Sequence, residues 1–262
     1  MQRVFITGAS SGLGAALARH YAGQGACLGL LARRGATLRQ LIATLPHPER
    51  HHAYTVDVTD ATALQQAAHD FIAAAGGIDV VIASAGISHG TLTELPQDLA
   101  VFNTILATNV SATVATFAPF IDTMKRQATP ARLVGIGSVA GIRGLPGAGA
   151  YSASKAALIS YCESLRLELK RHGIAVVTIC PGYIDTPMTQ KNTYRMPFLM
   201  RPERFAAAAA ATIAAGTSYR VIPWQMGLVA KALRLLPNGA YDRLFANAPH
   251  KARKEASAEV AP

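Results

Sequence analysis

The chain has 262 residues, of which 50% are hydrophobic and 15% are charged. This length and composition exclude a disordered protein and predict one substantial hydrophobic core. No uninterrupted run of eighteen apolar residues occurs and the N-terminus lacks the pattern of a signal peptide, so we expect a cytoplasmic protein without a membrane-spanning helix. Cys27, Cys162 and Cys180 stand among apolar residues without metal-ligand spacing, which predicts buried thiols and no metal site.

The net charge of +10 is unevenly distributed along the chain. Before Lys191, 14 Lys or Arg residues face 11 Asp or Glu, whereas from Lys191 onward 11 face only 4. A basic C-terminal part can attract nucleic acid or an anionic membrane. The sequence has no zinc, RNP-type or basic-zipper pattern, so we expect no nucleic-acid partner.

Segments typical of buried strands alternate with segments typical of amphipathic helices from the first residue. Strands are expected at residues 3–7, 26–32, 52–58, 78–86, 132–138, 174–180 and 219–222, and helices in the segments between them, including a long one over residues 96–127. This alternation predicts an α/β fold: a doubly wound parallel sheet of about seven strands with helices on both faces. No linker or tandem repeat interrupts it, so a single domain over residues 1–250 is expected.

The strand and helix rhythm weakens after Pro181. Residues 183–215 are expected to form a lid over the substrate site, residues 223–248 an extension of C-terminal helices, and residues 251–262 a flexible tail. The helix at 223–237 is amphipathic, with Met226, Val229, Ala230 and Leu233 among the residues of its apolar face. That face could pack on its own subunit, on a partner or on a membrane.

The segment TGASSGLG (residues 7–14) joins the first strand to the first helix. Its glycines allow a tight turn and a close approach of the backbone to a pyrophosphate, and the helix N-terminus favours negative charge. A glycine turn is weak evidence when it stands alone. At the first strand of a βαβ unit, this one predicts a dinucleotide site.

The end of the second predicted strand indicates which dinucleotide is bound. An acidic residue is expected there when the ligand is NAD, but Ala32 occupies the position and Arg33 and Arg34 follow it. Guanidinium groups suit a phosphate, so we expect NADP(H) to be preferred over NAD(H). Asp57, after the third strand, could bind the adenine amino group or cap the following turn.

Four further residues form a candidate reactive site. Tyr151 and Lys155 stand four residues apart on one helix, Ser138 follows the fifth strand, and Asn109 lies inside the long helical segment. An ammonium lowers the pKa of a nearby tyrosine, which can then act as general acid or base, while a serine hydroxyl binds the substrate oxygen. Glycines at 141, 144, 147 and 149 would let the chain fold back between Ser138 and Tyr151.

These motifs together resemble those of the short-chain dehydrogenase/reductase family, in order from residue 3 to about residue 190. The resemblance implies a Rossmann-type fold and hydride transfer between NAD(P)H and a carbonyl or alcohol. It also implies a homodimer or homotetramer and a catalytic tetrad of Asn109, Ser138, Tyr151 and Lys155, in which Asn109 holds a water and Lys155 the nicotinamide ribose. Cofactor contacts are expected from Gly8, Ser10, Ser11, Gly12, Leu13, Gly14, Arg33, Arg34, Asp57, Val58, Ala85, Gly86, Tyr151, Lys155, Pro181, Gly182, Ile184 and Thr186. One departure is Ala83-Ser84-Ala85-Gly86, where the family commonly has Asn-Asn-Ala-Gly.

The substrate side of the site is less specified by the sequence. Three of the six methionines lie in residues 183–200, which favours a lipophilic small-molecule substrate. Substrate contacts are expected from Ile142, Leu145, Tyr183 and Met188, with His89 and Arg143 as further candidates. A different class of function stays open at this point: a non-catalytic protein that senses NADP(H) and acts through its basic C-terminal part or at a membrane.

Overall fold

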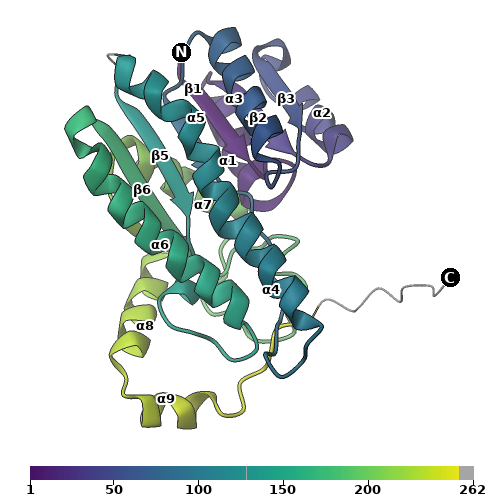
Figure 1. Ribbon diagram of the computed structural model, residues 1–262, viewed down its shortest axis with the longest axis vertical. Helices are drawn as coiled ribbons and strands as arrows, with labels where there is room; N and C mark the ends of the chain where they lie inside the picture. The colour runs from purple at the N-terminus through teal and green to yellow at the C-terminus, as the bar shows by residue number, and fades with distance from the viewer. Residues whose placement is uncertain (128, 254–262) are drawn as a thin grey trace, which may run out of the picture.

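The computed structural model describes residues 1–127 and 129–253, in which seven strands form one parallel sheet (Figure 1). Their order is β3-β2-β1-β4-β5-β6-β7, so the chain crosses over between β3 and β4 and the sheet grows outward in both directions from β1 and β4. The strands are β1 (Arg3–Thr7), β2 (Cys27–Ala32), β3 (His51–Thr55), β4 (Val80–Ala83), β5 (Ala131–Ile136), β6 (Ile174–Pro181) and β7 (Tyr219–Ile222). The predicted doubly wound parallel sheet of seven strands is confirmed.

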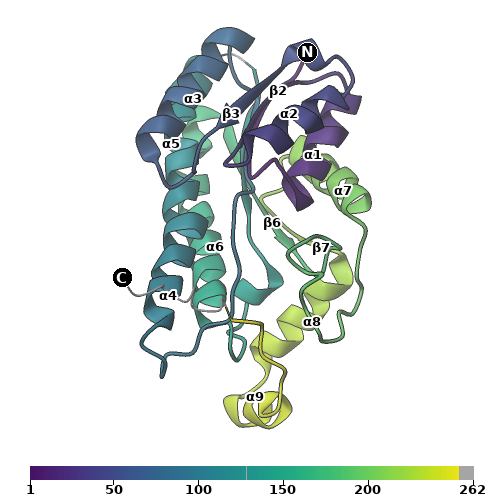
Figure 2. The ribbon, with the colours of Figure 1, turned by 90° about the vertical axis from the view of Figure 1, so that its right-hand side faces the viewer.

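Helices cover both faces of this sheet (Figure 2). One layer holds α1 (Gly12–Gly23), α2 (Gly35–Ala43) and α7 (Pro202–Ala214). The other holds α3 (Ala61–Ala75), α5 (Ala112–Arg126) and α6 (Gly149–Leu169), with α4 (Asp98–Leu106) leading into α5. Short 3₁₀ turns lie at η1 (Pro48–Arg50), η3 (Val139–Gly141) and η4 (Lys170–His172). Each face thus buries its own core, and the middle strands are apolar on both sides.

The long helical segment before β5 is interrupted by a π-helical turn, η2 (Ala107–Ser111), between α4 and α5. By length and composition alone, the stretch Asp98–Arg126 could cross a membrane, with a mean hydropathy of 1.4 over its most apolar part. The sequence contains no unbroken apolar run of eighteen residues, and the stretch meets this criterion because an average over a window tolerates scattered polar residues. Phe117, Phe120 and Met124 of this stretch pack into the core beside α3 and α6, and 39% of its most apolar part is buried.

The candidate lid is shorter than the sequence indicated. Residues 202–214 form α7, whose inner face, including Phe205, Ala206 and Ala209, is buried in the core. Its small alanine side chains let it pack closely on the alanine-rich helix α1. Only residues 183–200 therefore remain as a candidate lid.

The C-terminal helices α8 (Trp224–Leu235) and α9 (Asn238–Phe245) extend beyond the end of the sheet that carries the carboxyl ends of the strands (Figures 1 and 2). Met226 and Ala230 are buried, as the predicted apolar face requires, whereas Val229 is exposed together with Trp224 and Leu228. Residues 251–253 do not form part of a free tail, because they are held by hydrogen bonds to the body. The remainder of the predicted tail, 254–262, lies outside the described residues.

Candidate functional site

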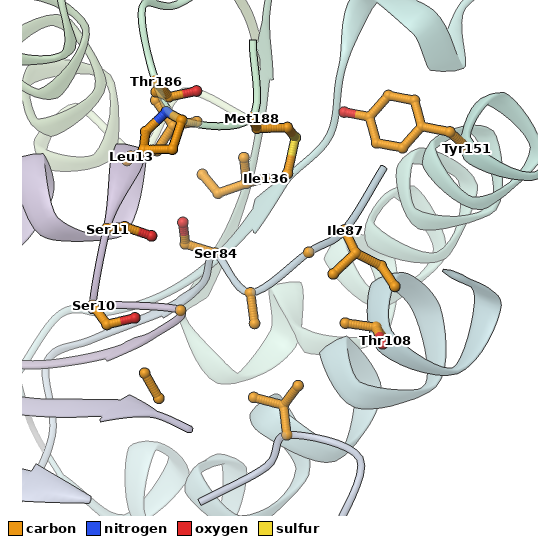
Figure 3. A pocket seen from close by; sticks show the side chains of 18 of the residues that line it. Ser10, Ser11, Leu13, Ser84, Ile87, Thr108, Ile136, Tyr151, Thr186 and Met188 are labelled. Atoms are coloured by element: carbon orange, nitrogen blue, oxygen red, sulfur yellow. The ribbon is translucent and has the colours of Figure 1, made fainter. Parts of the chain in front are cut away.

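A cavity of about 790 Å³ opens at the carboxyl ends of the central strands, where β1 and β4 lie side by side. This edge, at the point where the strand order reverses, is where open parallel sheets bind their ligands. Figure 3 shows serines of the glycine-rich turn, Tyr151, Thr186 and Met188 around it. The cavity is lined by all eighteen residues predicted for cofactor contact, and also by Ser138 and Met188.

The glycine turn is shaped by close packing against the loop after β4. Gly8 has a φ of +68°, and a Cβ added there would lie 2.7 Å from the Cα of Ala85. Gly14, inside the first turn of α1, is similarly pressed against the backbone of Gly8. The turn therefore has no room for side chains at Gly8 and Gly14. The residues at the start of α1 line the cavity, where a helix N-terminus favours a pyrophosphate.

Arg34 reaches back over this turn from the end of β2. Its Nη2 donates hydrogen bonds to the hydroxyls of Ser11 at 2.7 Å and Ser10 at 3.0 Å. Arg33 is 71% exposed and lies 3.7 Å from a carboxylate oxygen of Asp57. Ala32, the last residue of β2, lines the cavity beside them and brings no acid. The result is an exposed cationic rim beside the glycine turn.

The carboxylate of Asp57 accepts hydrogen bonds from Thr59, within the turn that follows β3. Its Oδ1 accepts hydrogen bonds from the backbone N–H of Thr59 at 3.0 Å and from the Thr59 hydroxyl at 2.8 Å. The backbone hydrogen bond from Thr59, with help from Arg33, holds the pKa of Asp57 below its usual value. The geometry is that of a turn cap. The carboxylate still lines the cavity.

Ser138 and Tyr151 converge from two different elements. Ser138 follows β5 and begins η3, where its Oγ accepts the N–H of Ala140 at 3.1 Å. Tyr151 lies in the first turn of α6 and points into the cavity (Figure 3). Burial raises the pKa of the Tyr151 phenol, and a hydrogen bond with Ser138 opposes that rise. The two hydroxyls are thus within reach of one substrate oxygen.

Lys155 lies one helical turn after Tyr151 and is almost fully buried. Its ammonium donates to the carbonyl oxygen of Ile136 at 2.8 Å and lies 5.8 Å from the centre of the Tyr151 ring. Burial lowers the pKa of Lys155 to about 8. None of the carboxylates that the structure describes pairs with this buried cation, so its burial is unfavourable for folding. Groups with such shifted pKa values cluster at functional sites.

Asn109 lies on the π-helical turn and does not line the cavity. Its side-chain oxygen accepts the N–H of Ile87 at 2.9 Å, and its amide nitrogen donates to the carbonyl of Ile87 at 3.0 Å and to Ser154 Oγ at 2.9 Å. The side chain thereby ties the loop after β4 to α6. These three hydrogen bonds explain why asparagine, a poor helix former, occupies this helical position. π-helical turns are also frequent at functional sites.

The loop between Ser138 and Tyr151 depends on two of its four glycines. A Cβ at Gly141 would lie 2.7 Å from the carbonyl carbon of Lys155, and Gly147 has a φ of +66° with the His250 ring against it. Among the described residues, no atom beyond the chain neighbours lies within 4 Å of a Cβ added at Gly144 or Gly149, so these two glycines are not required by close packing.

Only some of the residues predicted to contact substrate line the cavity. Met188 and His89 line the cavity, whereas Ile142, Leu145 and Tyr183 do not. Arg143, also a candidate, points away: its guanidinium donates to the carbonyl of Leu236 at 2.6 Å and stacks on Tyr241 at 3.9 Å. It links the loop to the end of α8, where the last carbonyls lack helical N–H partners.

One wall of the cavity was not anticipated. It comes from α4 and the π-helical turn, through Ala100, Val101, Thr104 and Thr108. These residues carry no motif, and only the approach of α4 to the sheet edge brings them to the cavity. Ile87, directly after the strand predicted at residues 78–86, also lines it.

Comparisons with known proteins agree with this geometry. The family model described as short chain dehydrogenase matches residues 2–196. An uncharacterised oxidoreductase of Myxococcus xanthus is 36% identical over 242 residues, covering 90% of this chain and 93% of its own. One from Mycobacterium tuberculosis is 38% identical over 227 residues, with coverages of 85% and 88%. The crystal structure of a short-chain dehydrogenase from Streptomyces avermitilis has a similar fold, with a TM-score of 0.79 at 24% identity over 88% of this chain and 92% of its own.

Proposed function

The chain belongs to the short chain dehydrogenase family of oxidoreductases acting on CH–OH or C=O groups, and from this premise we propose that it is an NADP(H)-dependent reductase of a lipophilic carbonyl compound. One observation carries the proposal. Ser138, Tyr151 and Lys155 meet in the cavity that the glycine turn also lines. A protein that only sensed a dinucleotide would have no chemical need for this convergence.

The preference for NADP(H) rests on Arg34. Its guanidinium is already oriented by the hydroxyls of Ser10 and Ser11 and faces solvent beside the glycine turn. A phosphate at that rim would gain charge-assisted hydrogen bonds from a planar cation. A ribose hydroxyl would find no acid, because Ala32 occupies its place.

Tyr151 is the proposed general acid during carbonyl reduction and the general base in the reverse direction. When bound, the nicotinamide supplies or accepts the hydride. Ser138 binds the substrate oxygen and stabilises the negative charge that develops on it. Tyr151 donates its phenolic proton to that oxygen, and the ammonium of Lys155 stabilises the phenolate left behind.

Asn109 is proposed to act by positioning. By binding both backbone groups of Ile87 and the hydroxyl of Ser154, its side chain fixes the cavity wall against α6. The family resemblance implies that Asn109 holds a water of a proton relay. Its side-chain amide already makes three hydrogen bonds to Ile87 and Ser154, so atoms outside this amide would have to bind that water.

The proposed lipophilic substrate is supported by the apolar side chains of the cavity. Met188, Ile87, Val101 and Ile184 face it from three separate segments. Methionine adapts to irregular apolar shapes, and ligand sites combine such walls with a few polar groups. Tyr183 would contribute only if the segment 183–200 moves, since its ring now packs on Tyr194.

We propose further that the protein is a cytoplasmic homo-oligomer. A peripheral membrane contact would have to use the exposed apolar side chains of α8, which include Trp224, Leu228 and Leu235. Co-sedimentation with anionic vesicles tests that alternative, and absence of binding at low salt would exclude it. Sedimentation analysis of the purified chain tests the oligomer.

The test of the function is a panel of ketones and aldehydes of graded chain length, followed by the absorbance of NADPH and, separately, of NADH. We expect consumption of NADPH that rises with the apolar character of the substrate. Tyr151→Phe should reduce turnover about 100-fold to 10,000-fold with its fold intact. Equal rates for wild type and this variant on every substrate would contradict the proposal.

A further inference from the structure

The last residues that the structure describes lie beside the proposed catalytic site. Residues 250–253, here called the C-terminal strap, run beside the loop that follows β4. The carbonyl of Ala252 accepts the N–H of Gly90 at 2.9 Å, and the ring of His250 lies against Gly147. Both contact points flank the start of α6, where Tyr151 stands.

An ion pair fastens the strap. Arg253 donates from Nε and Nη2 to the two carboxylate oxygens of Asp98, both at 2.9 Å. Asp98 is only 4% exposed and also accepts the N–H of Leu92 at 2.8 Å. The hydrogen bonds from Arg253 lower the pKa of Asp98. A bidentate pair on a buried carboxylate has a defined geometry, unlike an exposed surface pair.

The strap places Lys251 over the catalytic tyrosine. The Lys251 ammonium lies 5.4 Å from the centre of the Tyr151 ring, closer than that of Lys155 at 5.8 Å. Among the residues that the structure describes, it has no carboxylate or hydrogen-bond partner, and burial lowers its pKa. A desolvated cation held beside an ionisable phenol is unfavourable unless it meets a negative charge there.

Other groups also face Tyr151. Ser138 reaches it from β5, the thiol of Cys180 from β6, and the phenol of Tyr194 from the segment 183–200. Neither Cys180 nor Tyr194 stabilises a phenolate, since each would add negative charge if ionised. Lys155 and Lys251 are the described cations whose ammonium groups lie over the Tyr151 ring.

We propose that the C-terminal strap is part of the active site and that Lys251 is a positioning residue, which acts through Tyr151 by stabilising its phenolate. This inference rests on the proposed role of Tyr151 as general acid and base. Lys155, from inside α6, and Lys251, from the strap, then share the task of keeping the tyrosine pKa within a useful range.

The pH dependence of activity distinguishes this role from a structural one. A cation lowers the pKa of a phenol, so its removal raises that pKa. In Lys251→Met, the acid limb of the alcohol-oxidation profile should move upward by about one pH unit. Lys251→Arg should restore it. Lys170→Met, which removes the same charge from the opposite end of the α6 region, should leave the profile unchanged.

The ion pair gives an independent variant. Arg253→Gln leaves Lys251 in place but frees the strap, so the same upward shift is expected in a chain with a normal circular dichroism spectrum. An unchanged profile in both Lys251→Met and Arg253→Gln would overturn the inference. A change in KM for anionic substrates without a pH shift would also overturn it, because Lys251 would then bind substrate rather than act through Tyr151.

A titration without turnover separates this inference from the proposed function. The ultraviolet absorbance of tyrosinate is titrated in four proteins: wild type, Tyr151→Phe, Lys251→Met and the double variant. Subtracting the curve of the Tyr151→Phe protein from that of its parent gives the Tyr151 pKa with and without Lys251. A higher Tyr151 pKa after loss of Lys251 supports the inference even if no substrate is turned over. An equal pKa overturns it even if the enzyme is active.

Discussion

The Nη2 atom of Arg34 lies 2.7 Å from the hydroxyl of Ser11, so a cation at the end of β2 is hydrogen-bonded to the turn that begins α1. Two segments of the chain that are 23 residues apart are thereby joined at the rim of the cavity. The first prediction concerns this contact.

We expect Arg34→Gln to reduce kcat/KM with NADPH by roughly 10-fold to 100-fold, because a charge-assisted hydrogen bond contributes about 1.5–3 kcal/mol. The value with NADH should change by less than about 3-fold. Arg33→Gln is the matched control: Arg33 is 71% exposed and faces Asp57, so its effect should be smaller. Steady-state kinetics with both cofactors decide the matter, and an equal loss with NADPH and NADH would exclude a phosphate contact at Arg34.

Lys155 should make the protein less stable while making it active. Its folded-state pKa of about 8 lies below the ordinary 10.5, so the folded state binds fewer protons than the unfolded state between these values. The penalty is therefore fully present below pH 8 and is relieved as pH rises toward 10.5. It amounts to about 3 kcal/mol.

Lys155→Met should lose activity, because the cation that stabilises the Tyr151 phenolate is removed. The same variant should have a higher unfolding free energy than wild type at pH 7, because the penalty of burying the ammonium is also removed. The gain will be smaller than the full penalty, because the carbonyl of Ile136 loses its hydrogen bond. Urea unfolding of both proteins at pH 7 and pH 9.5 measures the difference, which should shrink at the higher pH. A difference that does not depend on pH would contradict the lowered pKa.

Substitutions at Asn109 and Ser154 remove different numbers of the hydrogen bonds that hold the wall of the cavity against α6. Asn109→Leu removes all three hydrogen bonds of a fully buried amide and leaves both backbone groups of Ile87 unpaired. We expect a loss of about 2–4 kcal/mol in unfolding free energy and a weakened cofactor affinity. Ser154→Ala breaks only one of these bonds and should cost about 1 kcal/mol. Equal losses in the two variants would show that the Ile87 contacts contribute nothing.

Asp79 lies directly before β4, at the amino ends of the central strands, and we expect it to contribute to acid stability. Burial works against ionisation of its carboxyl, but hydrogen bonds from the backbone and guanidinium of Arg3, at 2.8, 2.9 and 2.6 Å, outweigh burial and lower its pKa. A carboxyl with a lowered folded-state pKa stabilises the protein above its unfolded pKa of about 4, and this contribution disappears as pH falls through the folded value.

Asp79→Asn should therefore lose about 2 kcal/mol at pH 7 and have a flatter stability curve below pH 4 than wild type. Denaturant unfolding between pH 7 and pH 3 provides the measurement. Asp122→Asn is a suitable control, because Asp122 pairs with Lys125 only at 3.7 Å on the surface. Parallel pH curves for wild type and Asp79→Asn would refute the assignment.

The sequence by itself determined the succession of strands and helices along the chain, the glycine turn and the proposal that Ser138, Tyr151 and Lys155 act together. These features depend on spacing along the chain: an apolar run bounded by glycine forms a strand, and residues four apart share a helix face. Parallel strands end at one edge, and the motifs that follow β1, β2, β4, β5 and β6 line one cavity there, as the family resemblance implies.

Only the tertiary structure decided which distant segments meet there. The wall from α4, the π-turn that aims Asn109 at Ile87, the diversion of Arg143 to α8 and the inclusion of α7 in the core all depend on packing between segments far apart in sequence. The clearest case is Lys251, 100 residues after Tyr151 in a stretch that reads as a polar tail. Its place over the tyrosine ring follows from an ion pair between Arg253 and a buried Asp98, and no local periodicity encodes the partner of a buried charge.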